Sequence, residues 1–117
     1  MRQRSILALA AAAGALVVAL TGIAQAAPAA RKSLSAFTGP QFVIGIGKKK
    51  VAHGQFRITI RDRSGIHNFH LTGPGLNKKT GVSFVGTATW NVTLKPGTYR
   101  FVCDPHRTSM KGTIKVT

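Results

Sequence analysis

From about residue 42 onward, apolar and polar residues alternate with a period of two, which predicts strands and not helices. Phe56, Ile58 and Ile60 alternate with polar residues in 56–61, and 87–94 shows the same pattern. Further strands are expected at 42–46, 66–71, 82–84, 99–103 and 114–116, with a loop from 72 to about 81. Several short strands separated by turns predict an all-β fold, an antiparallel β-sandwich.

Two histidines in the segment 66–71 are predicted to point to opposite faces, because an odd number of positions separates them on a strand. His67 shares its face with Phe69 and Leu71, which belong in a core. His70 shares its face with the polar Asn68 and is expected at the surface. His67 is therefore the histidine that we expect to face the interior.

The first 26 residues have the pattern of a secretory signal peptide. A basic start with Arg2 and Arg4 precedes the apolar stretch 6–23, and small residues before Ala27 suit cleavage after Ala26. An uncleaved membrane anchor is the alternative, since the apolar stretch has 18 residues. We expect an extracytoplasmic protein, in the periplasm or at the cell surface.

The remaining chain divides by composition into a short lead-in and one domain. Residues 27–38 are rich in small and basic residues and are expected to be flexible. Residues 39–117 carry the strand pattern and form the predicted domain, which is large enough for one core.

The charge of the chain is strongly positive. Lys and Arg number 17 against two acidic residues, which gives a net charge of +15, or +13 without the two leader arginines. The acidic residues, Asp62 and Asp104, lie in separate turns 42 positions apart, which disfavours a hydrolase that needs paired carboxylates. The charge favours an acidic partner protein or an anionic cell-envelope surface. We expect no nucleic acid partner, since the chain has no recognised motif for one and the leader directs it elsewhere.

One loop near the C-terminus contains three side chains that can bind a metal. Cys103, the only cysteine, cannot form an internal disulfide, and it is followed by His106 and by Met110, the only methionine after the initiator. A thiolate with two imidazoles and a weak axial thioether is the ligand set of electron-transfer copper. His67 is the predicted second imidazole. Alternatively, Cys103 is an inert core thiol and Met110 fills the core, or the pocket binds zinc.

The motifs that contain these residues resemble the plastocyanin/azurin family of cupredoxins. They are 64–69 (SGIHNF), 97–106 (GTYRFVCDPH) and 110–112 (MKG), and the resemblance covers most of 42–117. The combination is specific, although Cys-x-x-His alone would be weak.

The resemblance implies a Greek-key β-sandwich with one type 1 copper ion, Cu(I) or Cu(II), near one end. It assigns His67, Cys103, His106 and Met110 as the metal ligands. It also implies that Asn68 steadies the ligand loop. His106 would lie near the surface in an apolar patch that includes Pro105, where the electron leaves.

These observations favour a secreted, monomeric copper protein that carries single electrons to a redox partner and is not an enzyme. Copper storage or delivery with the same ligands is one alternative. A metal-free module that binds anionic surfaces through its positive charge is another. A Cys/His nucleophilic enzyme is disfavoured, because the sequence shows no oxyanion site for Cys103 and His106.

Overall fold

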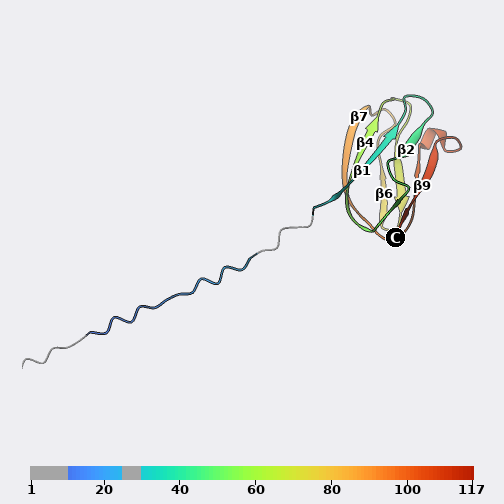
Figure 1. Ribbon diagram of the computed structural model, residues 1–117. Helices are drawn as coiled ribbons and strands as arrows, with labels where there is room; N and C mark the ends of the chain where they lie inside the picture. Colours follow the sequence, from blue (N-terminus) through green and yellow to red (C-terminus); the bar gives the residue numbers. More distant parts are fainter. Residues whose placement is uncertain (1–10, 25–29) are drawn as a thin grey trace, which may run out of the picture.

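The computed structural model describes residues 11–24 and 30–117, and its strands form two packed sheets (Figure 1). The four-stranded sheet has the order β2-β1-β4-β7, with bounds Ile44–Ile46, Lys32–Thr38, Gly54–Asp62 and Gly86–Leu94. The five-stranded sheet has the order β3-β9-β8-β5-β6, with bounds Lys50–Val51, Lys111–Val116, Gly97–Val102, His70–Gly73 and Leu76–Lys79. A short 3-10 helix, η1 (Asp104–His106), connects β8 to β9. The predicted all-β sandwich is confirmed.

Both sheets are mixed, which refines the antiparallel prediction. Strands β1 and β4 pair in parallel, as do β3 and β9, and the remaining pairings are antiparallel. The core lies between the sheets, where alternate residues of each strand point inward. On β4 the buried residues Phe56, Ile58 and Ile60 match the predicted pattern, and Trp90, Val92 and Leu94 on β7 do the same.

The prediction of a flexible lead-in at 27–38 is wrong for its second half. Residues 32–38 form β1, which lies between β2 and β4 inside a sheet. Leu34 and Ala36 are buried there and alternate with exposed serines. The period of two is therefore present, but small and polar residues disguise it.

Four further predictions, one loop and three strands, need correction. The expected loop at 72–81 contains β6, which forms a hairpin with β5, and 82–84 is not a strand. In 66–71 only the last two residues belong to β5, so the segment with His67 is irregular. In 42–46 the strand begins at Ile44, which leaves Phe42 in a loop.

The structure describes only residues 11–24 of the predicted signal peptide 1–26. Residues 11–24 are exposed and contain no helix or strand. The basic start and the cleavage site after Ala26 lie outside the described residues. Within the described ranges, no helix is long and apolar enough to cross a membrane.

Candidate metal centre

The candidate site lies at the end of the sandwich where β8 stops and η1 begins, away from the C-terminus (Figure 1). Cys103 directly follows β8, and His106 is the last residue of η1. Pro105 suits the first turn of a helix, because its φ is already fixed there. The His106 N–H donates to the Cys103 carbonyl at 3.0 Å. This tight turn keeps the thiol and the imidazole close together.

Three side-chain donor atoms converge at this point: His67 Nδ1, Cys103 Sγ and His106 Nδ1. The sulfur lies 3.7 Å from the nitrogen of His67 and 3.6 Å from that of His106, and the two nitrogens are 3.1 Å apart. His67 and Cys103 are buried, whereas His106 is partly exposed. Within residues 11–24 and 30–117, no other group of three His, Cys, Asp or Glu side chains is so placed. The structure therefore brings together three of the four predicted ligands.

His67 reaches the site from the loop between β4 and β5. Its backbone N–H donates to the Ser64 carbonyl at 3.4 Å, which turns the chain inward. Ile66 is exposed, as strand alternation predicts, but Asn68 departs from the alternation because it is buried together with His67. The inward direction of His67 was predicted, but it comes from this turn and not from a strand.

Met110, the fourth predicted ligand, is fully buried beside the same loop. Its N–H donates to the His106 carbonyl at 2.8 Å, and its carbonyl accepts from the Cys103 N–H at 3.0 Å. Met110 does not belong to the hydrophobic cluster between the two sheets.

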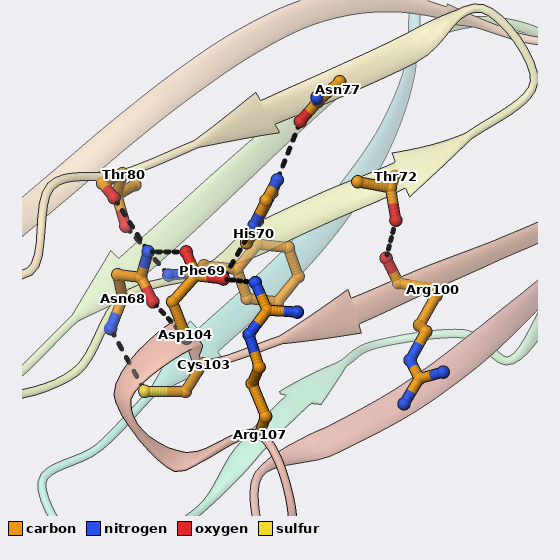
Figure 2. A network of polar contacts seen from close by, with 10 residues as sticks. All are labelled: Asn68, Phe69, His70, Thr72, Asn77, Thr80, Arg100, Cys103, Asp104 and Arg107. Atoms are coloured by element: carbon orange, nitrogen blue, oxygen red, sulfur yellow. Dashed lines mark hydrogen bonds and ion pairs between the residues drawn. The ribbon is translucent and has the colours of Figure 1, made fainter.

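Asn68 ties the two halves of the site together (Figure 2). Its backbone N–H donates to Cys103 Sγ at 3.5 Å, and its side-chain oxygen accepts from the Asp104 N–H at 2.7 Å. Its side-chain amide donates to the Thr80 carbonyl at 3.1 Å and to Asp104 Oδ2 at 2.8 Å. The network agrees with the expectation that Asn68 steadies the ligand loop.

Asp104 continues this network toward the surface (Figure 2). Its Oδ1 lies 2.9 Å from His70 Nδ1 and accepts from the Arg107 guanidinium at 2.7 Å. Burial favours the neutral carboxyl, but the hydrogen bonds from His70 and Asn68 and the positive charges of His70 and Arg107 outweigh it. The pKa of Asp104 is therefore below its usual range. His70, which was expected at the surface, is partly buried here, and its Nε2 lies 2.7 Å from Asn77 Oδ1.

Phe42 is a site residue that sequence reasoning missed. Its ring packs edge-on against both imidazoles, with centroids 5.3 Å from His67 and 4.9 Å from His106. The side chain is nevertheless 60 % exposed, so it covers the histidines from the solvent side. The available signal was an aromatic residue between a glycine–proline turn and β2, which sequence analysis had assigned to a strand.

The donor set suits copper. Imidazole nitrogens and a soft sulfur at a buried position are the ligands that copper takes in electron-transfer sites, and Met110, which carries a thioether, is buried in the same loop. None of the three donor residues is a carboxylate, which hard ions such as magnesium or calcium prefer.

Comparisons with known proteins agree with this geometry. A family model described as "Copper binding proteins, plastocyanin/azurin family" matches residues 37–117. A solution structure of reduced rusticyanin is similar at 22 % identity and a TM-score of 0.57, covering 73 % of this chain and 76 % of that one. A reduced amicyanin variant is similar at 19 % identity and a TM-score of 0.52, covering 76 % and 86 %. A search of curated protein sequences finds no match.

The structural similarities support the cupredoxin fold, and the family match covers the whole site from Phe42 to Met110. The residues that could hold copper lie in that range and converge at one end of the sandwich. The chain therefore belongs to the plastocyanin/azurin family of copper-binding proteins, and it is a copper electron-transfer protein.

Proposed function

We propose that His67, Cys103 and His106 bind one copper ion in a type 1 site, with Met110 as the axial ligand. When bound, the ion supplies a Cu(II)/Cu(I) couple that takes up and releases one electron. The observation that carries the proposal is the convergence of one sulfur and two Nδ1 atoms at distances of 3.1 to 3.7 Å. No acid or base is needed for this function, so the protein is a carrier and not an enzyme.

The surrounding chain holds the ligands in one arrangement. The 103–110 loop is closed by backbone hydrogen bonds from Cys103 to Met110 and from Met110 to His106. Asn68 fixes the other side through its bonds to the sulfur and to Asp104. Ligands that cannot move far keep the same geometry in both oxidation states, which supports fast electron transfer.

The electron leaves through His106 and the surface around it. His106 is partly exposed, and Phe42 packs against its ring at the solvent boundary. Further exposed apolar side chains occur in the neighbouring loops: Val43, Ile66, Val82 and Val85. An apolar end around a partly exposed ligand suits brief contact with a redox partner protein, to which cupredoxins pass electrons.

Charge adds a preference for an acidic partner. Arg107 within the ligand loop and Lys111 directly after it are exposed. Of the two carboxylates, Asp62 is buried and Asp104 is paired. Almost no negative charge is therefore left to repel an anionic surface, and association with an acidic protein should weaken as salt rises. The protein acts as a monomer in this proposal.

Family members are typically extracytoplasmic. For this chain we propose export by the signal peptide 1–26, with cleavage after Ala26, into the periplasm or to the cell surface.

The proposal is tested by titrating the purified metal-free protein with Cu(II) while recording visible absorption. An intense thiolate-to-copper band should saturate at one equivalent and be absent in Cys103→Ser. Thr98→Val, on an exposed position of β8, is the matched control and should keep the band. Folded, reduced protein without such a band would contradict the proposal.

Electron transfer is separated from copper delivery by a second measurement. Cyclic voltammetry of the loaded protein should show a reversible one-electron couple, and the copper should stay bound when an acceptor chelator of moderate affinity is added. Irreversible cycling with rapid loss of copper to the chelator would favour storage or delivery.

A further inference from the structure

A second group of polar side chains lies behind His67, on the side opposite the sulfur. Among the described residues, three buried side-chain atoms have no hydrogen-bond partner: Thr38 Oγ1, Asp62 Oδ2 and His67 Nε2. All three residues are at most 1 % exposed. A buried polar atom without a partner costs roughly 1–3 kcal/mol, so three such atoms require an explanation.

The strand register places two of these atoms side by side. Strands β1 and β4 are parallel, and their inward positions face each other as Leu34 with Ile58, then Ala36 with Ile60, then Thr38 with Asp62. Two apolar pairs are thus followed by one polar pair at the end next to the metal centre. The register partner of Asp62 on β7 is Gly86, which adds no side chain beside the carboxyl.

The third atom, His67 Nε2, faces the same end of the β1–β4 pair. A Cβ added at Gly39, the residue after Thr38, would lie 3.2 Å from His67 Cδ2 and 2.9 Å from Ser64 Cβ. Because Cδ2 is bonded to Nε2, the Nε2 edge of the His67 ring is turned toward the chain that follows Thr38. Gly39 also has a φ of +71°, so both its backbone and the close approach of the ring require glycine.

Asp62 and His67 also influence each other electrostatically. Burial raises the pKa of Asp62, while the N–H of Ser64 and the nearby His67 act in the opposite direction without reversing the shift. Of the two Asp62 oxygens, only Oδ1 has a hydrogen-bond partner, the Ser64 N–H at 3.0 Å. Oδ2 is therefore free to accept a hydrogen bond from the direction of His67.

We propose that Asp62 and Thr38 position His67 through one bridging water molecule. The water accepts the Nε2–H of His67 and donates its two protons to Asp62 Oδ2 and Thr38 Oγ1, so that all three buried atoms are satisfied. With the proton held at Nε2, the lone pair of His67 is on Nδ1, the atom that faces Cys103 and His106. Asp62 and Thr38 are thus positioning residues for the metal ligand. The inference rests on the proposed function, which it extends from the ligands to the groups that orient one of them.

The test uses Asp62→Asn in the full domain. The amide keeps the Oδ1 acceptor for Ser64 but puts an N–H₂ donor at the Oδ2 position, so the bridge to the Nε2–H is broken. Thr38→Val removes the hydroxyl at nearly constant shape. Thr59→Val, on β4 but away from the site, is the matched control. Circular dichroism and thermal unfolding verify that each variant is folded.

The first readout needs no copper. Nitrogen-15 NMR of the His67 ring in metal-free protein at pH 7.5 should show a protonated Nε2 and an unprotonated Nδ1 in the wild type and in Thr59→Val. Asp62→Asn should give a mixture of the two tautomers, and Thr38→Val a smaller change in the same direction. An unchanged His67 tautomer in folded Asp62→Asn would overturn the proposal.

The second readout uses the loaded protein. Cu(II) affinity, measured by competition with a chelator, should fall about tenfold in Asp62→Asn, the size typical for groups that orient a metal ligand. The reduction potential should rise, because removing a negative charge near the site destabilises Cu(II) relative to Cu(I). If the wild type shows no copper band, the proposed function fails. The tautomer measurement on metal-free protein still decides the role of Asp62. If the band is present and both tautomer and affinity are unchanged, the bridge alone is refuted.

Discussion

The two sides of the metal centre are supported in different ways. On the Cys103 side, Asn68 and Asp104 form a network in which each of their side-chain oxygen and nitrogen atoms has a protein partner (Figure 2). On the His67 side, Thr38 and Asp62 each leave a buried oxygen without a protein partner. Direct hydrogen bonds fix the geometry around the Cys103 sulfur. The His67 side instead depends on Thr38 and Asp62, the polar pair at the end of the apolar β1–β4 face. The sulfur side is therefore held by direct protein hydrogen bonds, whereas the His67 side relies on the proposed water bridge.

The same contrast appears in the two carboxylates of the chain. Asp104 has a lowered pKa because hydrogen bonds and positive charges outweigh its burial. Asp62 has a raised pKa because burial outweighs its single N–H bond and the influence of His67. The two acids therefore change stability in opposite directions as the pH changes.

The largest effect is expected from removing the centre of the sulfur-side network. Asn68→Ala leaves the Thr80 carbonyl and the Asp104 N–H unpaired and should lower the free energy of unfolding of metal-free protein by about 3 kcal/mol. Urea denaturation measures this change. Asn77→Ala is the control, because this exposed amide hydrogen-bonds to the side chain of His70, and it should cost about 0.5 kcal/mol or less. Equal losses in both variants would show that the buried Asn68 network adds no more to stability than an exposed amide does.

A smaller effect with a defined pH dependence is expected from Asp104→Asn. Because the folded-state pKa is lowered, the ionised carboxylate stabilises the fold above the unfolded value of 3.8, and this contribution disappears as the pH falls through the folded-state pKa. The variant should thus be less stable than the wild type at pH 7, and the difference should shrink toward pH 2. Denaturation of metal-free protein across this range measures it, and a difference independent of pH would contradict the assignment.

The smallest effect on stability, with the reverse trend, is expected from Asp62→Asn. A raised folded-state pKa means that the fold prefers the neutral acid, so the Asp62 contribution falls as the pH rises from 3.8 through the folded-state pKa. The stability of the wild type relative to Asp62→Asn should therefore increase on acidification. The same denaturation series measures this, and parallel trends for the two variants would show that the two carboxylates occupy similar environments.

Much of the fold could be predicted where both faces of a strand had clear chemistry. Strands β4 and β7 alternate apolar and polar residues through most of their length, and the structure has strands there as expected. Strand β1 was missed because its inward residues include Ala36 and Thr38, and Phe37 points outward. Strand β6 was missed because a turn-rich stretch precedes it and Leu76 is its only apolar residue.

The site residues that are close together in the sequence could be predicted, and those brought in from distant segments could be predicted less well. Cys103, His106 and Met110 are close in sequence and carry a rare combination of side chains, so their grouping could be predicted. The inward direction of His67 was predicted from strand alternation, although a turn produces it. Phe42, Thr38 and Asp62 could not be predicted as site residues, because only the packing of the 39–43 loop and the β1–β4 register brings them behind or over the histidines.

X-ray absorption at the copper edge, recorded on the oxidised and the reduced protein, reports which atoms bind the ion in each state. We expect two imidazole nitrogens and one short copper–sulfur bond in both oxidation states, with little change in the copper–ligand distances. A copper ion without a sulfur ligand in either state, or a change in the number of ligands on reduction, would contradict a rigid electron-transfer site built from His67, Cys103 and His106.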